Sequence, residues 1–253
     1  MGKDHFEVLC VSTASAGKSM LLNALMGRHL LPTRSSLCTT KVHRLFHPSN
    51  GGPVRCRCRT SARGRTPWKE CSRDLLTELG RGAHQEIEMD VCFPNIRMPK
   101  KRSTLCLIDT PGTNSTCVER HADIGRTLLA SSDYQGLIVV MNGIYQGSTD
   151  EGYLLEQVRE GCSRARNTRI IPLFALSMLD RLNVEESPVE RVQETHVYLE
   201  SLGFKKPVVI PVMAQRSLLI RTLLQRYVGM ADSDEIHEED LHHLQRQIPL
   251  YEK

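Results

Sequence analysis

The chain has 253 residues, of which 40% are apolar, 25% charged and 5% aromatic. This length suits one α/β domain with an insertion, and the apolar residues can fill a core built mainly from leucine, isoleucine and valine. The formal net charge of +4 is too small to require a polyanionic partner, so a nucleic-acid ligand is not expected. No apolar stretch approaches the ~18–20 residues that cross a bilayer, which leaves only peripheral membrane contact open.

The cysteines indicate a reducing compartment. There are nine of them, an odd number, and Cys10, Cys92 and Cys106 fall inside apolar runs as small hydrophobic residues. With no signal peptide recognisable at the start of the sequence, this pattern favours a cytoplasmic location. Cys56 and Cys58 are not expected to bind zinc, because their spacing is short and no second ligand pair follows.

Strands and helices alternate along the chain, which predicts a mostly parallel sheet covered by helices on both faces. Strands are expected at residues 6–11, 86–93, 104–109, 136–142, 169–176 and 207–212. Helices are expected at residues 18–27, 71–80, 118–130, 149–165, 187–202 and 215–228. The best-marked helix has Ser187 before Pro188 at its start and Gly203 after its end.

Residues 12–19 read STASAGKS and lie between the first apolar run and a helical segment. Backbone N–H groups of such a small-residue loop, with the positive end of the following helix, can surround a polyphosphate. Lys18 would then contact the outer phosphates, and the hydroxyl of Ser19 would ligate Mg²⁺. The usual pattern begins with glycine, and Ser12 replaces it here. A second site is therefore needed to support nucleotide binding.

That second site follows the strand expected at 104–109. Asp109 stands at the end of this strand, and Gly112 follows three residues later. An aspartate beside a phosphate loop can hold Mg²⁺ through water, and the glycine N–H can meet the terminal phosphate. The two motifs, in this order and each at a strand end, predict a nucleotide-binding site.

Several segments together resemble the GTPase domain of the dynamin family, particularly the bacterial dynamin-like proteins. These are STASAGKSMLLNALMGRHLLP followed by LCTTKV, then LCLIDTPGTNS, LIVVMNG and VVIPVMAQRSLLIR. The resemblance covers most of residues 6–225 and is weakest across 45–85. It implies an α/β, three-layer P-loop NTPase (GTPase) domain with a mostly parallel central sheet, spanning residues 1–228.

The resemblance also implies ligands and roles for individual residues. GTP or GDP would be bound by Ser15, Ala16, Gly17, Lys18, Ser19, Met20, Gly112, Asp180, Met213 and Ala214. Mg²⁺ would be held by Ser19, Thr40 and Asp109. Thr40, aligned with the Mg²⁺-sensing threonine of the first switch, and Lys18 would be the catalytic residues.

Several positions depart from the family pattern. The base-recognition motif [NT]-K-x-D reads Ser177-Met178-Leu179-Asp180, so Asp180 can pair with guanine while the charge of the lysine is lost. Such a loss of polar contacts costs about 1–3 kcal/mol, or roughly tenfold to a hundredfold in affinity. Met213-Ala214 replaces the usual Ser-Ala, Met20 replaces a hydroxyl, and Ala14 replaces the glutamine that organises hydrolysis in eukaryotic dynamins.

Two functions stay open because binding is better preserved than turnover. The first is a slow, Mg²⁺-dependent GTPase, for which the resemblance implies a homodimer formed across the nucleotide face, as in family members. The second is a nucleotide-binding interaction module with little or no hydrolysis. A P-loop ATPase fits the D-T-P-G and Asp180 pattern less well. The long helices that form a bundle and stalk in the family are absent from this sequence, which suggests either a stand-alone domain or a shortened relic.

Residues 45–75 are expected to form an irregular, basic insertion, of which residues 50–75 are expected to be dispensable for nucleotide binding. Arg55, Arg57 and Arg59 alternate, so a strand would place them on one face. A solvated edge is favoured there over a basic patch for nucleic acid or anionic lipid. Residues 229–253 form an acidic, His-rich tail that is expected to fray, and its histidines favour a solvated surface over a metal site.

Overall fold

The computed structural model describes eleven segments of the chain, and the account below concerns these alone. They are residues 5–33, 41–47, 52–61, 64–82, 86–94, 96, 104–111, 119–131, 134–164, 170–183 and 185–227. Only the backbone is described at residues 73, 81, 119–123 and 224–227. Thr40, Gly112 and the tail expected at 229–253 lie outside the described residues.

One sheet organises these segments, with the strand order β4-β3-β5-β2-β6-β1-β7-β8-β9. The five strands at one end all run parallel and form the block that carries the candidate site. They are β6 (Thr104–Asp109), β1 (His5–Ser12), β7 (Gly136–Asn142), β8 (Pro172–Ser177) and β9 (Val208–Pro211). The prediction of a mostly parallel sheet is confirmed.

The other four strands extend the sheet beyond β6. They are β2 (Val42–Phe46), β5 (Glu86–Asp90), β3 (Arg55–Arg59) and β4 (Lys69–Glu70). β2 is antiparallel to β6 and parallel to β5, and β3 is antiparallel to both of its neighbours. The direction of the sheet therefore changes at β2, next to the strand that ends in Asp109.

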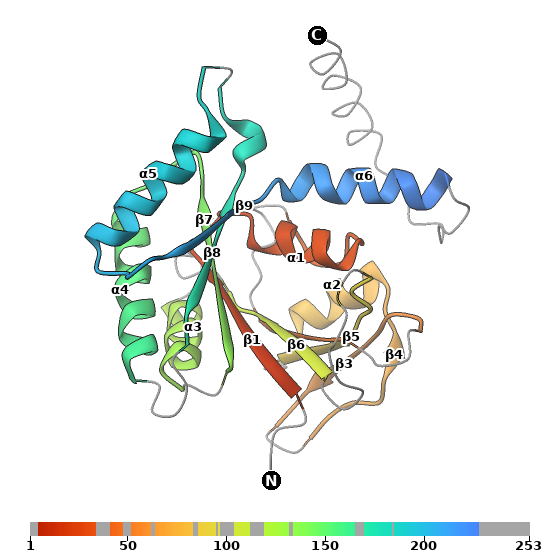
Figure 1. Cartoon of the computed structure of the whole chain (residues 1–253). Helices are drawn as coiled ribbons and strands as arrows, with labels where there is room; N and C mark the ends of the chain where they lie inside the picture. The colour runs from red at the N-terminus through yellow and green to blue at the C-terminus, as the bar shows by residue number, and fades with distance from the viewer. Residues whose placement is uncertain are drawn as a thin grey trace.

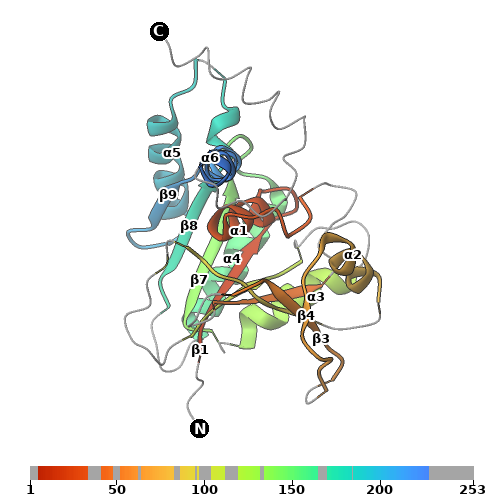
Figure 2. The same ribbon diagram turned by 90° about the vertical axis from the view of Figure 1, so that its right-hand side faces the viewer.

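Helices cover both faces and complete three layers (Figures 1 and 2). On one face lie α3 (Glu119–Ser131), α4 (Thr149–Arg164) and α5 (Pro188–Ser201). On the other lie α1 (Lys18–Met26), α2 (Arg73–Arg81) and α6 (Ala214–Tyr227). A short 3₁₀ turn, η2 (Leu179–Arg181), follows β8. The three-layer α/β fold expected from the alternating pattern is confirmed.

Local signals set the helix ends where the sequence predicts them. Ser187 caps α5 by accepting a hydrogen bond from the Glu190 N–H, and Pro188 occupies the first turn. Gly203, with φ of +89°, ends this segment in a conformation that favours glycine. α1 ends at Gly27, which has φ of +68°. The guanidinium of Arg221 then donates to the carbonyl of Ala24 at the end of α1, which ties α6 to α1.

The basic segment differs from the expectation, because it is built into the sheet. Residues 45–75, expected to be irregular, hold β3 and β4, and β2 was not predicted either. Cys56 and Cys58 are 1% and 0% exposed and pack in the core beneath α2. β3 was not predicted, because cysteines that alternate with arginines give only a weak apolar pattern. Deleting this segment would uncover that core, and whether nucleotide binding survives the deletion stays a prediction.

A buried lysine ties α2 to the start of β2. Lys41 Nζ donates to the carbonyl of Leu79 at 3.0 Å and to the carbonyl of Gly82, at the C-terminal end of α2. A cation is stabilised at a helix C-terminus, where carbonyl groups lack helical partners. Burial lowers the pKa of Lys41 from its ordinary value. In the described part of the chain, no helix is both long and apolar enough to span a membrane.

Candidate functional site

The predicted phosphate loop joins β1 to α1 at the carboxyl edge of the sheet. Two of its residues adopt the left-handed backbone conformation, Ser15 with φ of +59° and Gly17 with φ of +88°. α1 then begins at Lys18, and the N–H of Leu21 donates to the Gly17 carbonyl. The loop residues therefore stand at the positive end of α1, where free N–H groups favour an anion.

β1 lies between β6 and β7 in the parallel block, and the chain crosses the sheet in opposite directions on its two sides. Ligands of open α/β sheets bind at such a switch point, outside the carboxyl ends of the strands. Met20 lies one turn into α1 and is partly buried, whereas Ala14 and Ser15 are exposed. Ala16 is buried beneath the loop.

Lys18 and Asp109 form a buried ion pair beneath the loop. Lys18 Nζ contacts Asp109 Oδ1, and the two residues are 5% and 0% exposed. Burial by itself would raise the pKa of Asp109, but the charge of Lys18 and contact with His43 outweigh it and lower this pKa below its ordinary value. Asp109 is therefore an anion that faces the loop lysine.

The second carboxylate oxygen of Asp109 is free to accept a further hydrogen bond or to bind a metal ion. Asp109 Oδ2 is buried without a hydrogen-bond partner among the described residues, and His43 Nδ1 lies 3.6 Å from it. A buried carboxylate oxygen with no partner is costly unless another group binds it. Mg²⁺ prefers carboxylate and hydroxyl oxygens, so Asp109 together with the nearby Ser19 fits this ion.

The strand pairing fixes the position of this carboxylate. Asp109 is paired in register with Cys10 of β1 and with His43 of β2. The hydroxyl of Thr110 donates to the Cys10 carbonyl at 2.9 Å, which anchors the chain just after β6. Burial, followed by the nearby negative charge of Asp109, raises the pKa of the Cys10 thiol to about 12, so it stays neutral beside the site.

The segment predicted to recognise the base lies directly beside the phosphate loop. A Cβ at position 17 would stand 2.7 Å from Ser177 Oγ and 3.5 Å from Met178 Cε. Met178 has φ of +63°, and this turn carries the chain from β8 into η2, which holds Asp180. The guanidinium of Arg216, on α6, donates to the backbone carbonyl of Asp180 at 3.4 Å.

Of the remaining predicted residues, Met213 and Ala214 lie at the carboxyl edge of the sheet. Met213 is 36% exposed and Ala214 is buried at the start of α6, just after β9. The loop, Asp109, Asp180 and the 213–214 pair therefore all follow carboxyl ends of parallel strands. Thr40 and Gly112 lie outside the described residues.

Two residues of the site were not predicted from the sequence. His43 reaches Asp109 only because β2 pairs with β6, and β2 itself was missed. Asn23, fully buried in α1, bonds through its side chain to Leu30 and Leu31 in the segment that leads away from α1. A polar residue on the buried face of an expected helix was the signal that could have revealed Asn23.

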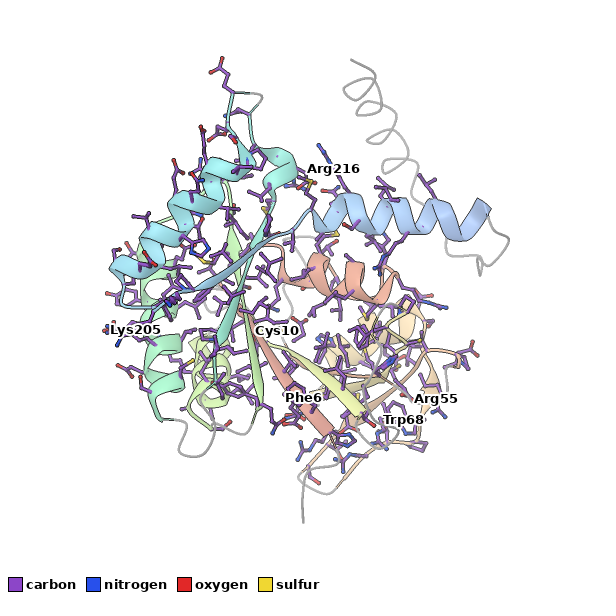
Figure 3. The ribbon with its side chains drawn as sticks, in the orientation of Figure 1. Phe6, Cys10, Arg55, Trp68, Lys205 and Arg216 are labelled. Atoms are coloured by element: carbon purple, nitrogen blue, oxygen red, sulfur yellow. The ribbon has the colours of Figure 1, made fainter. Side chains whose placement is uncertain are left out.

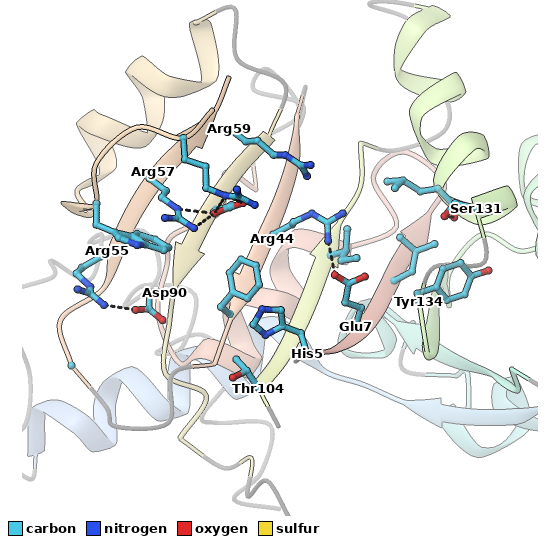
Figure 4. Close-up of a pocket in the computed structure, with 18 of the residues that line it drawn as sticks. His5, Glu7, Arg44, Arg55, Arg57, Arg59, Asp90, Thr104, Ser131 and Tyr134 are labelled. Atoms are coloured by element: carbon cyan, nitrogen blue, oxygen red, sulfur yellow. Dashed lines mark hydrogen bonds and ion pairs between the residues drawn. The ribbon is translucent and has the colours of Figure 1, made fainter. Parts of the chain in front are cut away.

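The arginine face predicted around 55–59 exists, and acidic neighbours neutralise it (Figure 4). Arg55 pairs with Asp90, Arg57 with Glu88, and Arg59 with Glu86, each across β3 and β5. Trp68 lies against this face, with the guanidinium of Arg57 4.2 Å from its ring centroid. These groups border a groove of about 950 Å³ on the sheet. The pairing supports a solvated surface and gives no support to a nucleic-acid site.

No group of histidine, cysteine and carboxylate side chains suited to a structural metal occurs among the described residues. Cys56 and Cys58 are both free thiols. Both are buried in the core beneath α2, where they pack as small apolar side chains.

The fold is shared with known bacterial dynamins. Two solved structures of an oligomerised bacterial dynamin pair, described as a mechanism for long-range sensing and tethering of membranes, superpose with TM-scores of 0.58 and 0.56. Each is 16% identical in sequence over 97% of this chain, which spans 40% of one of those chains and 48% of the other. At this identity the likeness shows the fold alone. The present chain is less than half as long as either.

The family itself is identified from the sequence. No curated protein matches this chain significantly. The model of the dynamin family matches residues 8–164, which is more than half of the chain and includes the phosphate loop and Asp109. The chain therefore belongs to the dynamin family.

Proposed function

We propose that this protein binds GTP and GDP together with Mg²⁺ at the edge formed by the phosphate loop, Asp109 and Asp180. The buried ion pair between Lys18 and Asp109 carries this proposal. It places a cation, Lys18, where the phosphates of GTP would need positive charge, and an anion, Asp109, where Mg²⁺ would need a carboxylate. When a nucleotide binds, Lys18 would exchange Asp109 for phosphate oxygens.

Different residues of the phosphate loop and its neighbours would contact the phosphates and the Mg²⁺ ion. Backbone N–H groups of Ser15, Ala16 and Gly17, with those of Lys18 and Ser19, would surround the phosphates. Met20 would lie near the α-phosphate, and Gly112 would contact the terminal phosphate. Ser19, Thr40 and Asp109 would hold Mg²⁺, which supplies positive charge against the phosphates.

The base would bind at the opposite end of the loop. The carboxylate of Asp180 accepts hydrogen bonds from the N1–H and N2–H₂ groups of guanine, a pair of donors that adenine does not offer. The aliphatic side chain of Met178 would lie against the base, and the backbone of Met213 and Ala214 would border it. The proximity of Met178 to Gly17 supports this placement, because it joins the base end to the phosphate end.

We propose that hydrolysis is slow in the monomer and depends on Thr40. Phosphoryl transfer requires a positioned water and compensation of charge on the phosphate oxygens. Lys18 supplies part of that charge, and Thr40 would position the water through its backbone carbonyl. Ala14, exposed on the loop, has no side chain that could orient a water. A second copy facing the nucleotide would supply the missing stabilisation.

A second candidate is a nucleotide-binding interaction module that hydrolyses little or no GTP. The methyl side chain of Ala14 and the uncharged side chain of Met178 favour it, because both replace polar groups used in the family. In either case we propose a cytoplasmic setting, which the free state of all seven described cysteines supports. Contact with a membrane surface is compatible with both functions.

Binding is tested by titration with fluorescent GTP and ATP analogues. We expect GTP to bind more tightly than ATP, and Lys18→Ala to weaken binding of both. Lys69→Ala, which removes an exposed lysine from β4, is the matched control and should leave affinity unchanged. Equal affinity for the two analogues would remove guanine preference, and no binding of either would refute the nucleotide site.

Turnover is tested by measuring phosphate release over a wide range of protein concentration, for the wild type and Thr40→Ala. Specific activity is expected to rise with concentration and to fall in the variant. A substantial rate that is independent of concentration and unchanged by the substitution would refute this mechanism. Complete absence of turnover with intact GTP binding would establish the interaction module instead.

A further inference from the structure

Two buried polar atoms face each other beside the phosphate loop. His43 Nδ1, on β2, and Asp109 Oδ2, on β6, lie 3.6 Å apart. Neither atom has a hydrogen-bond partner among the described residues. The two side chains are 8% and 0% exposed, so both atoms are shielded from bulk solvent. Because burial of such an atom is costly unless it is hydrogen-bonded, the pair is suited to bind a group that bonds to both.

The sheet fixes the position of both side chains. His43 lies directly opposite Asp109 in the antiparallel pairing of β2 with β6, and it is also paired with Ile87 of β5. Residues opposite each other in an antiparallel pair point to the same face. Leu45, two residues further along β2, is fully buried among side chains of α1 and α2, so this face is the one on which α1 lies. Cys10, in register with Asp109, lies on the half of β1 nearer α1 (Figure 3).

β2 is anchored on both sides of His43. Before it, Lys41 Nζ donates to carbonyl groups at the C-terminal end of α2. After it, His47 Nδ1 accepts a hydrogen bond from the N–H of Phe93 at 3.0 Å. The imidazole between these anchors is therefore held in place before any ligand arrives, which favours precise binding.

The two atoms are too far apart for a direct hydrogen bond, which for N–H···O spans about 2.7–3.2 Å. Burial alone would raise the pKa of Asp109, but the charge of Lys18 lowers it, so Oδ2 is a carboxylate oxygen that only accepts hydrogen bonds. His43 Nδ1 also accepts when the imidazole proton is on Nε2. One water molecule, about 2.8 Å from each atom, would donate one hydrogen to Oδ2 and the other to Nδ1.

A metal-bound water fits this pair better than the metal ion itself. Adjacent ligands of an octahedral Mg²⁺, each about 2.1 Å from the ion, are about 3.0 Å apart, and this ion prefers oxygen to imidazole nitrogen. The separation of 3.6 Å between His43 Nδ1 and Asp109 Oδ2 is larger than that. Mg²⁺ usually keeps several of its waters in protein sites. Such a water bonds to the ion through its oxygen and has two hydrogens left to donate, which match the two acceptors.

We propose that His43 and Asp109 together hold one water molecule of the bound Mg²⁺ ion, through Nδ1 and Oδ2. This role of His43 rests on the proposed function and adds a positioning residue to the same site. The two oxygens of Asp109 then have separate partners. Oδ1 contacts Lys18, the residue that would bind phosphate, and Oδ2 faces His43. Outer-shell groups of this kind orient the inner ligands of a metal ion and so raise its affinity.

Substitutions at position 43 separate the acceptor from the packing. His43→Leu fills a similar space without a polar atom, whereas His43→Asn keeps an acceptor oxygen where Nδ1 stands, since both atoms are bonded to the γ carbon. His43→Gln keeps the same amide one carbon farther out, where it corresponds to Nε2. His47→Leu is the matched control, because it removes a histidine acceptor just beyond the other end of β2.

The measurement is the affinity of the full chain for a fluorescent GDP analogue, in EDTA and across a titration with Mg²⁺. We expect His43→Leu to raise the Mg²⁺ concentration of half-maximal effect about tenfold, the size of effect typical of a lost outer-shell partner. In EDTA its affinity should change far less, because no metal-bound water is then present. His43→Asn should restore most of the Mg²⁺ response, and His43→Gln should not. His47→Leu should lower the melting temperature and leave the Mg²⁺ midpoint as in the wild type.

A Mg²⁺ midpoint in His43→Leu equal to that of the wild type would overturn the proposal. So would an equal loss of affinity in EDTA and in Mg²⁺, because the substitution would then damage the whole site. If His43→Leu does not fold, the comparison of His43→Asn with His43→Gln decides, and equal midpoints in these two variants would overturn the role of Nδ1. A wild type that does not bind the analogue, or binds it without any response to Mg²⁺, would instead refute the proposed function itself.

Discussion

Gly17 of the phosphate loop and Ser177 at the end of β8 lie so close that no side chain fits between them. A Cβ on Gly17 would stand 2.7 Å from Ser177 Oγ, well inside van der Waals contact. Gly17 also has φ of +88°, which disfavours any L-residue with a side chain. This contact joins the segment that would hold phosphates to the segment that would hold the base.

The first prediction is that Gly17→Ala sharply weakens GTP binding. Alanine here adds a clash with Ser177 to a backbone strain of about 1–2 kcal/mol. Gly147→Ala is the matched control, because its φ is +76° but nothing lies within 4 Å of the added carbon. Titration with a fluorescent nucleotide measures the effect on binding, and thermal unfolding measures the effect on stability. Equal losses of GTP affinity and of thermal stability in the two variants would show that backbone strain alone causes them. The close contact between Gly17 and Ser177 would then have no effect.

The second prediction is that Met178→Lys raises GTP affinity about tenfold, since it restores a polar contact of roughly 1–2 kcal/mol. ATP affinity should change less, because Asp180 still selects guanine. Ile220→Lys, on an exposed part of α6, adds the same charge away from the site and should have no effect. If Met178→Lys leaves GTP binding as it was, the base does not lie against this residue.

The third prediction concerns Asn23, whose side chain organises the segment after α1. Its Oδ1 accepts from the N–H groups of Leu30 and Leu31, and its Nδ2 donates to the Leu31 carbonyl. Asn23→Ala leaves these buried groups without partners, which should lower the free energy of unfolding by about 2–3 kcal/mol. Thr222→Ala, which removes a single bond within α6, should cost under about 1 kcal/mol. Denaturant unfolding compares the two.

The fourth prediction is that Glu88 makes the protein sensitive to acid. Glu88 is 2% exposed and pairs with Arg57 and Arg65. Burial alone would raise the pKa of Glu88, but hydrogen bonds and charge from Arg65 and Arg57 hold it below its ordinary value. The resulting stability is present above the ordinary glutamate pKa of about 4.3 and is lost as the pH falls through the lowered value.

Glu88→Gln should therefore be less stable than the wild type at neutral pH, by about 1–3 kcal/mol. The difference should shrink as the pH falls below about 4 and through the lowered pKa of Glu88, because the wild-type carboxyl then takes up a proton. Asp90→Asn is the control, because its partner Arg55 is 48% exposed and a pair of this kind contributes only about 0–1 kcal/mol. Unfolding curves measured from pH 3 to 7 provide the test. A difference that does not vary with pH would contradict the assignment to this ion pair.

The local signals in the sequence were sufficient to place most of the elements. β6 and β7 occupy the predicted residues, and α4 and α5 end within one residue of prediction. These segments carry continuous apolar runs or capping residues, which act over a few neighbouring positions. β2 and β3 escaped prediction, because their buried side chains are interrupted by charged ones or are cysteines, and β4 because it consists of two exposed charged residues. Their strand character depends on the neighbours that they pair with.

The same distinction holds at the site. The positions of Lys18, Asp109 and Asp180 at or just after strand ends could be predicted, because apolar runs mark those strands in the sequence. Their roles toward phosphate, metal and base stay predictions. The motifs indicated the class of ligand without any knowledge of the sheet. Thr40 and Gly112 rest on the sequence and its resemblance alone.

What the sequence determined by itself was the order of most elements, the family and the residue types offered at the carboxyl edge, since each depends on residues close together in the chain. Tertiary structure decided the rest. The pairing of β2 with β6 brings His43 to Asp109. The pairing of β3 with β5 gives every arginine of β3 an acidic partner. The packing of α6 on α1 brings Arg221 to the carbonyl of Ala24. Each depends on which segments meet in space, and contacts between distant residues leave no periodic mark in the sequence.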